Sequence, residues 1–472
     1  MSIDAFRESP WSTPHTSYRG SALSLNPAPE YANSEVLVAG LYRTIGLDIS
    51  EGKVPVKGRE LDRDIAQQRN KGTKPGSAAL EADVFHDLLR VVLESPKLRN
   101  QSTKRFLQVS PLVGETALFS GSARLAGNPW PAGTLTRRMV WLGSADDASA
   151  RTSWEKLFAA LSIERDEDVF ARFLTDEIGA WTGEKWGPIG FPAASDVAPM
   201  SPADRDNRSY PARQFVGDLE SIVAAKPLMT RRQWVSLLES LVRMAAVAHV
   251  AWLCEVQKRI WSCIELAIAG APPPARMADE IYPERFRYLN YGTGAISELK
   301  DRTSKYLKAR LGINATLWAL DGIGKPFRQG LSSAAEIEAL CAHIRANRTS
   351  LEKVTAIVEE IADRESRTMM CRKGIGANLM EFARHVLYQR IAADDRLRGY
   401  DQGYLLRKRG PSKSSQWICA PGPVAVLAAV HCCLSGLSGP RSVHRLAQHL
   451  AGYGIGIDHR DIAQNELGHQ LR

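Results

Sequence analysis

The sequence predicts a mainly α-helical protein with a small β-containing region, and three observations support this. Apolar residues recur every three or four positions through much of the 472-residue chain, which is the spacing of amphipathic helices. One stretch, residues 228–269, contains neither Gly nor Pro and is longer than an ordinary globular helix. The hydrophobic share of 44% and the charged share of 24% are those of a globular chain. We therefore expect a bundle-like assembly of many helices.

The chain is longer than one ordinary core requires, so several packed units are expected. Residues 1–33 are rich in Ser, Pro and Asn and predict a flexible arm. A stretch rich in Pro, Ser and Asp at 187–213 predicts a domain boundary. The expected units are the arm at 1–33, an α domain with minor β structure at 34–190, a central helical domain at 210–400, and a basic loop with a C-terminal module at 401–472. No internal repeat of 30–50 residues is evident.

In the first domain, helical spacing alternates with turn-rich sequence. Helices are expected at 36–47, 78–93, 154–161 and 169–181, with Asp166 or Asp168 as the N-cap of the last one. The mixed-charge stretch at 51–76 predicts a solvated loop. The only expected strands lie near 105–143, where the short apolar runs 106–109 and 139–142 flank a cluster of Gly and Pro.

The central domain is expected to pack around one long helix at 230–269. Thr230 and Gln233 have the spacing of a capping box, and Gly270 followed by three prolines ends the pattern. Unbroken, such a helix would be about 60 Å long. A pair of helices with a kink near His249 is the alternative. Further helices are expected at 297–311, 334–346, 350–364 and 377–393.

Composition also predicts the compartment. No basic segment followed by an apolar run occurs in the first 30 residues, so no secretory signal is expected. The seven cysteines are sparse and odd in number, which favours reduced thiols in a cytoplasmic protein. The most apolar stretch, residues 244–254, is much shorter than the 17–25 residues of a membrane span. We expect it to be part of a buried core helix.

Motifs for cofactors and metals are weak. The pair Gly324 and Lys325 is followed by Pro326, which lacks the N–H group that a phosphate-binding loop would use. The residues Cys419, His431, Cys432 and Cys433 lie close in sequence but lack standard zinc spacing. We expect these cysteines to be small buried side chains, and we expect neither a cofactor nor a metal.

Candidates for catalysis are equally sparse. Asp279, Glu298 and Lys300 are the residue types of a metal-dependent nuclease, but their segment predicts turn and helix instead of adjoining strands. Glu381 and His385 are four residues apart on an expected helix, so they can form a base oriented by a carboxylate or an ordinary salt bridge. His249, within the apolar face of the long helix, is expected to be a core histidine.

The positive charge is concentrated in one region. The whole chain carries a net charge of +9, and residues 364–445 alone contain fourteen Lys or Arg against five acids. Within and near this region we expect nucleic-acid contacts from Arg396, Arg398, Arg407, Lys408, Arg409, Lys413, Arg441 and Arg445. Several of them alternate with Tyr400, Tyr404 and Trp417, whose rings can stack on bases. A basic loop that contacts an acidic protein surface is the alternative.

After Pro423 the chain shows three short helical segments, at 424–434, 441–450 and 459–471, separated by turns. This pattern resembles the three-helix core of a helix-turn-helix or winged-helix domain. In such domains the third helix contacts DNA. The resemblance implies that His459, Arg460 and Gln464 would face DNA, together with His469.

Taken together, these patterns predict a non-catalytic nucleic-acid-binding protein, with DNA as the expected partner. The expected setting is a larger bacterial DNA-transacting assembly, such as genome or antiviral defence or mobile-element maintenance, with protein partners on the central helices. Contact with about six duplex phosphates would give a slope of log affinity against log salt near −5. Two alternatives stay open: a helical adaptor that docks an acidic protein, and an enzyme whose site is assembled only in the fold, with a nuclease as the first example.

Overall fold

The computed structural model describes the chain in the following ranges: 3–11, 14–25, 34–47, 74–93, 96–97, 113–119, 132–164, 167–189, 210–369, 375–397, 399–412, 414–439, 441–458, 460, 462 and 465–471. Within them the protein is mainly helical with only short strands, as the sequence predicts. One hydrophobic core cluster contains residues from all four of the expected units, from Phe6 to Ile455.

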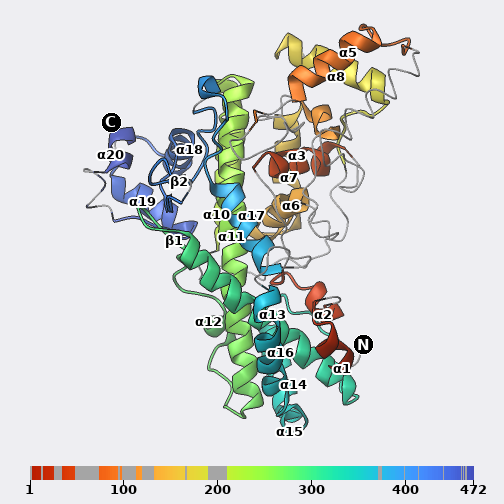
Figure 1. The fold of residues 1–472 in the computed structure, drawn as a ribbon, viewed down its shortest axis with the longest axis vertical. Helices are drawn as coiled ribbons and strands as arrows, with labels where there is room; N and C mark the ends of the chain where they lie inside the picture. Colours follow the sequence, from red (N-terminus) through yellow and green to blue (C-terminus); the bar gives the residue numbers. More distant parts are fainter. Residues whose placement is uncertain are drawn as a thin grey trace.

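Helix α11 (Arg231–Ile268) is the axis of the molecule and runs through most of its length (Figure 1). It is one continuous helix of 38 residues, so the alternative with two helices is wrong. The expected capping box is present, since Thr230 accepts from the backbone N–H of Gln233 and the Gln233 side chain accepts in return. Its length and composition would allow it to cross a membrane, but its most apolar window is 100% buried, as in a core helix.

Helix α13 (Ile296–Gly322) packs along α11 and extends past its expected end at Leu311. At their crossing, a Cβ on Gly312 would lie 2.3 Å from the ring of Trp261, so only glycine allows this approach. The remaining central helices surround this pair (Figure 1); they are α12 (Met277–Ile281), α14 (Ala334–Ala346), α15 (Arg348–Leu351), α16 (Val354–Met369) and α17 (Ile375–Leu387).

Three N-terminal helices lie on one side of α11 (Figure 1): α3 (Ser34–Gly46), α6 (Ala132–Gly143) and α7 (Asp147–Leu161). Helix α10 (Pro211–Ala224), which is followed by the short turn η3 (Lys226–Leu228), packs against α6, α7 and α11. A smaller core joins α5 (Ala82–Leu93), α8 (Val169–Thr182) and η2 (Gly114–Leu118) at one tip of the molecule. Asp168, one of the two residues predicted as the N-cap of α8, is its N-cap and accepts from the backbone N–H of Ala171.

Two predictions for this half of the chain are corrected. The run 139–142, expected as a strand, lies within α6, where Met139, Val140 and Leu142 are all fully buried. Because α6 packs against α3, α7 and α10, it is apolar on several sides, and a short apolar run of this kind does not distinguish a buried helix from a strand. The other run, 106–109, lies outside the described residues.

The second correction concerns the arm. Its described residues, 3–11 and 14–25, form helices α1 (Ile3–Glu8) and α2 (Thr16–Arg19) and pack against the central helices. Phe6 and Tyr18 are fully buried, and Arg138 donates hydrogen bonds to the carbonyl groups of Ser21, Ala22 and Ser24. The flexible-arm prediction is therefore wrong for these residues, since the two buried aromatic side chains outweigh a Ser- and Pro-rich composition.

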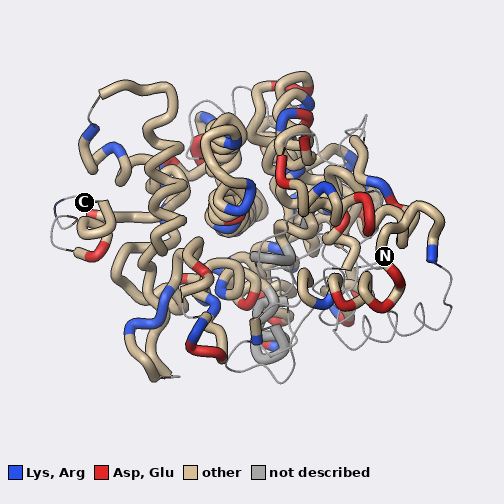
Figure 2. The backbone as a smooth tube through the Cα atoms, turned by 90° about the horizontal axis from the view of Figure 1, so that it is seen from above, with Lys and Arg blue, Asp and Glu red and all other residues tan. Residues whose placement is uncertain are grey.

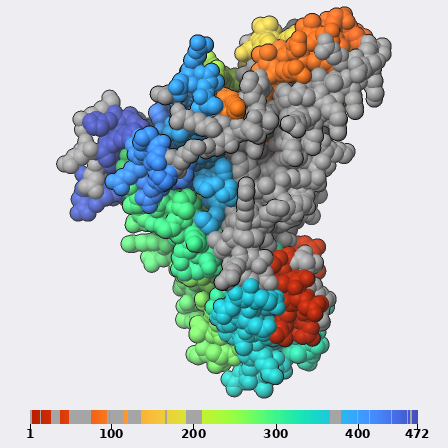
Figure 3. Space-filling model, in the orientation of Figure 1, coloured from red at the N-terminus to blue at the C-terminus, as the bar shows by residue number. Residues whose placement is uncertain are grey.

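The described strands lie in residues 402–471, which we call the C-terminal lobe, and at residues 289–290 of the central domain, which pair with that lobe. Strand β1 (Leu289–Asn290) pairs in parallel with β4 (Ile455–Gly456), and β2 (Leu406–Lys408) pairs antiparallel with β3 (Trp417–Cys419). The lobe also contains α18 (Pro423–Leu434), α19 (Val443–Gly452) and α20 (Glu466–Leu471). It projects from one side of the molecule, shown in dark blue in Figure 3.

Candidate functional site

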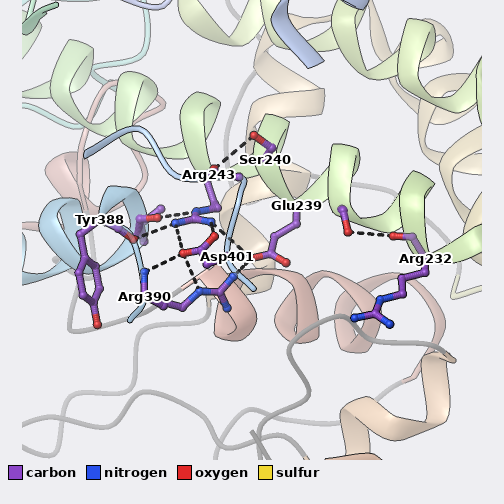
Figure 4. Close-up of polar contacts among 10 residues, drawn as sticks. Arg232, Glu239, Ser240, Arg243, Tyr388, Arg390 and Asp401 are labelled. Atoms are coloured by element: carbon purple, nitrogen blue, oxygen red, sulfur yellow. Dashed lines mark hydrogen bonds and ion pairs between the residues drawn. The ribbon is translucent and has the colours of Figure 1, made fainter. Parts of the chain in front are cut away.

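Helix α11 carries one polar stripe near its N-terminus. Arg232, Ser236, Glu239 and Arg243 are separated by four, three and four residues, so they share one face of the helix. Figure 4 shows Glu239 and Arg243 projecting from α11 toward Arg390 and Asp401, while Arg232 lies apart from them. The rest of α11 is largely apolar and buried, so this stripe marks the place where the helix meets a polar neighbour.

Two residues of the stripe, Glu239 and Arg243, form a four-residue ion cluster with Arg390 and Asp401 (Figure 4). Arg243 donates to both carboxylate oxygens of Asp401, at 2.7 and 3.3 Å. Arg390 donates to Asp401 through its backbone N–H at 2.8 Å and through Nε at 3.0 Å. A second guanidinium nitrogen of Arg390 donates to Glu239 at 2.8 Å. All four side chains are buried, and their two positive and two negative charges balance.

The cluster fixes the segment after α17 on α11. Arg243 also donates to the carbonyl oxygens of Val386 and Tyr388, at 2.8 and 3.0 Å. Burial alone would raise the pKa of Asp401, but the charges and hydrogen bonds of the two arginines outweigh it and hold that pKa well below its ordinary value. Asp401 therefore stays ionised at neutral pH, and the cluster stays neutral as a whole.

A cavity of about 640 Å³ opens beside the cluster, between the start of α11, residues 400–403 and α18. Its lining includes all four cluster residues, together with Arg232 and the apolar side chains of Leu228 and Leu427. A second, more polar cavity of about 610 Å³ lies between α10, α18 and α19.

A row of aromatic side chains links α17 to the β2–β3 hairpin. The ring of His385 lies 4.9 Å from that of Tyr388, and Tyr388 lies 5.2 Å from Trp417, both pairs edge to face. Lys408, the cross-strand partner of Trp417, places its Nζ 5.6 Å from the centre of the indole ring. Arg409 follows at the exposed end of β2. We refer to His385, Tyr388, Lys408, Arg409 and Trp417 as the hairpin surface.

The pair Glu381 and His385, considered for catalysis, adjoins this surface. His385 Nε2 lies 2.7 Å from a carboxylate oxygen of Glu381, and Arg384 donates to the other oxygen at 2.5 Å. The hydrogen bond from His385 is the main cause that lowers the pKa of Glu381, with the charges of His385 and Arg384 adding to it against the effect of burial. The partly exposed pair thus forms a salt-bridge network with Arg384 as a third member.

Other basic residues from the prediction are used within the fold. Arg407 donates to Glu466 at 2.6 Å, Arg460 donates to Asp458 at 2.7 Å, and Arg445 donates to the carbonyl oxygen of Cys433. Arg396 and Arg441 are exposed. Four of the predicted residues lie outside the described part of the chain: Arg398, Lys413, His459 and Gln464. Figure 2 shows that the described Lys and Arg of the lobe that ends at the C-terminus occupy separate segments of its backbone.

The third helix of the expected helix-turn-helix module is much shorter than predicted. After α19, Gly454 turns with a φ of 71°, and its carbonyl group accepts from the backbone N–H groups of Tyr288 and Leu289. The pairing with β1 places Ile455 and Gly456 in strand β4, Arg460 lies in a turn, and α20 begins at Glu466 instead of His459. The module is therefore joined to the central domain by a parallel β pair, which the sequence pattern does not reveal.

The more polar cavity contains a group that sequence patterns missed. The buried carboxylate of Asp218 accepts from the hydroxyl of Tyr453 at 2.6 Å and lies 3.0 Å from His449 Nε2. Asp218 is on α10 while the other two are at the end of α19, so no local spacing brings them together. Cys432 and Cys433 line the same cavity. Burial raises the pKa of the Cys432 thiol, which keeps it protonated and disfavours its use as a nucleophile.

The remaining sequence candidates lie in unrelated places. Asp279 is in α12 and Glu298 is in α13, where Asn290 donates to it at 3.2 Å. They do not share the adjoining strands of a nuclease site. His249 is fully buried, as expected, but neither ring nitrogen has a hydrogen-bond partner among the described residues. Burial, with the nearby charge of Arg138, lowers the pKa of His249 to about 3.

Comparison of the chain with protein-family models, with curated proteins and with solved structures gives no match.

Proposed function

We propose that the protein is a non-catalytic nucleic-acid-binding component and that the hairpin surface contacts the nucleic acid. The observation that carries the proposal is the row of three rings, His385, Tyr388 and Trp417, ending at the two cations Lys408 and Arg409. Aromatic rings stack on bases, at about 1–3 kcal/mol per base, and cations attract the adjoining phosphates. The combination suits a nucleic-acid strand with unpaired bases, and single-stranded DNA is the first partner to test.

The cations of this surface lie at its outer edge. Lys408 contacts the ring of Trp417, a cation–π interaction of about 0.5–1 kcal/mol, and donates to the carbonyl oxygen of Ser412 at 3.1 Å, so a phosphate that draws Lys408 away must outweigh both contacts. The side chain of Arg409 is exposed. By contrast, the buried Arg390 is neutralised by Asp401 and Glu239, so it adds nothing to the outer positive field.

The surface is also held in place before any ligand arrives. The carbonyl oxygen of Tyr388 accepts from Arg243, and the backbone N–H of Gln389 donates to the carbonyl oxygen of Leu406 at 2.7 Å. These hydrogen bonds hold Tyr388 and the start of β2 in fixed positions relative to the ion cluster. A preorganised surface loses little conformational entropy on binding, which favours affinity.

In this proposal the long helical frame contacts protein partners while the hairpin surface holds a nucleic-acid strand. A cytoplasmic DNA-transacting assembly, such as one in genome defence or mobile-element maintenance, would suit that combination. The competing function is an adaptor that uses the same cations to dock an acidic protein. The two functions predict different behaviour toward acidic polymers without bases.

Fluorescence anisotropy with a labelled 30-mer of dT tests the proposal. The variant Lys408→Gln/Arg409→Gln should weaken binding and reduce the steepness of the salt dependence by about 1.4, since each phosphate on a single strand contributes about 0.7. Trp417→Leu should weaken binding about 5- to 150-fold through lost stacking. The matched control is Lys325→Gln/Arg328→Gln, which removes two exposed cations beyond the end of α13.

Equal losses in both double variants would show a response to total charge and would overturn the assignment of the surface. Absence of any dT binding in wild-type protein would remove the proposal altogether. Competition by poly-L-glutamate as strong as that by unlabelled dT would favour the adaptor, because glutamate offers carboxylates but no bases. Circular dichroism of each variant establishes that its helices are intact.

A further inference from the structure

The cavity beside the ion cluster has an apolar mouth that the fold leaves open. Leu228, in the turn before α11, is 80% exposed, and Leu427, on α18, is 57% exposed. Both line the same cavity although they come from different elements, and Met229 and Val424 lie beside them. Burying apolar surface contributes about 25 cal/mol per Å² of free energy, so a ligand that covers these side chains would be stabilised.

The polar part of the cavity carries a net positive charge. Three guanidinium groups, of Arg232, Arg243 and Arg390, face two carboxylates, of Glu239 and Asp401. Arg243 and Arg390 are already matched to those carboxylates. The exposed Arg232 side chain has no ion-pair or hydrogen-bond partner among the described residues, and in Figure 4 no dashed line reaches its guanidinium group. One positive charge at the rim is thus left for a ligand.

The start of α11 does not supply this charge by itself. Its capping box already engages Thr230 and Gln233 with each other. The side chain of Arg232 supplies a full charge beyond the helix start, and a substitution can remove it without disturbing the cap.

We propose that this cavity binds a small organic anion with an apolar body, the acidic group at Arg232 and the apolar part between Leu228 and Leu427. A volume of about 640 Å³ is within the usual range of small-molecule sites, about 300–1,000 Å³. The hairpin surface plays no part in this site, so the inference stands apart from the proposed nucleic-acid contact.

Titration of the full chain with 8-anilinonaphthalene-1-sulfonate, a fluorescent aromatic anion, tests the site. We expect saturable binding at one site per chain and displacement by decanoate. Decanol, which has the same chain length without the charge, should compete at least about tenfold more weakly. Arg232→Glu and Leu427→Asp should each weaken binding by about tenfold or more.

Matched controls separate this site from general dye binding. Arg285→Glu inverts an exposed charge after α12, and Leu266→Asp alters a leucine that is 56% exposed at the other end of α11. Both should bind the dye as the wild type does. The proposal is overturned if the controls lose as much affinity as the test variants, if decanol competes as well as decanoate, or if several equivalent sites are titrated. Melting temperatures of all four variants show whether each is folded at the temperature of the titration.

Discussion

Replacing Asp401 with asparagine isolates the role of the ion cluster in holding residues 386–401 on α11. The Asp401 side chain is 1% exposed and binds both Arg243 and Arg390. The substitution keeps the size of the side chain but changes the buried net charge from zero to +1. An uncompensated buried charge typically costs about 3–5 kcal/mol, since its lost hydration is no longer offset by a partner.

The assay is thermal unfolding followed by circular dichroism at pH 7. With about 2 °C per kcal/mol for a chain of this size, the melting temperature should fall by about 6–10 °C. The matched control is Asp301→Asn, which breaks an exposed ion pair with Lys305 in which the side chains are 59% and 51% exposed. Such a surface pair contributes about 0–1 kcal/mol, so the control should melt within about 2 °C of the wild type.

A double variant sharpens the test. Adding Arg390→Gln to Asp401→Asn returns the buried charge to zero, so the pair of changes should destabilise by less than the sum of the single ones. Strict additivity, or a melting temperature for Asp401→Asn equal to that of the control, would refute the reasoning that charge balance holds this segment in place.

Three further outcomes are expected. Burial lowers the pKa of His249 to about 3, from its ordinary value of 6.5, so neutral His249 stabilises the fold above pH 6.5 and this stabilisation is lost as the pH falls toward 3. Between pH 7 and pH 5 the free energy of unfolding should fall by about 2 kcal/mol for this reason. The melting temperature of His249→Leu should therefore drop less over this range than that of the wild type. The carboxylate of Glu177 accepts hydrogen bonds from the backbone N–H groups of Ala79 and Leu80 and from the indole N–H of Trp181. Glu177→Gln should therefore lower the free energy of unfolding by about 1–3 kcal/mol, measured by urea unfolding, and an unchanged midpoint would contradict this. Thr230→Ala should cost about 1 kcal/mol by the same method, because it removes the α11 capping box, whereas Ser236→Ala on the next turn should cost less.

Helices α11 and α14 were predictable because their signals are local. The limits expected for the helix at 334–346 are those of α14, where Ser333 caps the first turn. The capping box of α11 and the glycine and prolines after it are likewise read from neighbouring residues. Such signals depend on hydrogen bonds within four residues, so a single sequence contains them in full.

What the sequence did not reveal depends on contacts between distant residues. Strands β1 and β4 have two residues each, too few for any alternation, and they exist because each supplies the other's hydrogen bonds. The ion cluster joins Glu239 and Arg243 to Arg390 and Asp401 from a segment far along the chain. The same holds for Asp218 and Tyr453. No spacing rule connects such residues before the fold is known.

The structure also changes what a basic composition implies for binding. Counting Lys and Arg along the sequence treats each as a free surface charge, yet Arg390 is buried against two carboxylates, and Arg384 and Arg407 have acidic partners on the surface. Contact with about six duplex phosphates would give a salt slope near −5, whereas two to four contacts from the hairpin surface and its neighbours on a single strand give about −1.4 to −2.8. A measured slope in the smaller range, reduced further by Lys408→Gln/Arg409→Gln, would fit a compact contact of rings and cations. A slope near −5 would require a broad electrostatic face, in which Arg384, Arg390 and Arg407 would have to exchange their acidic partners for phosphates.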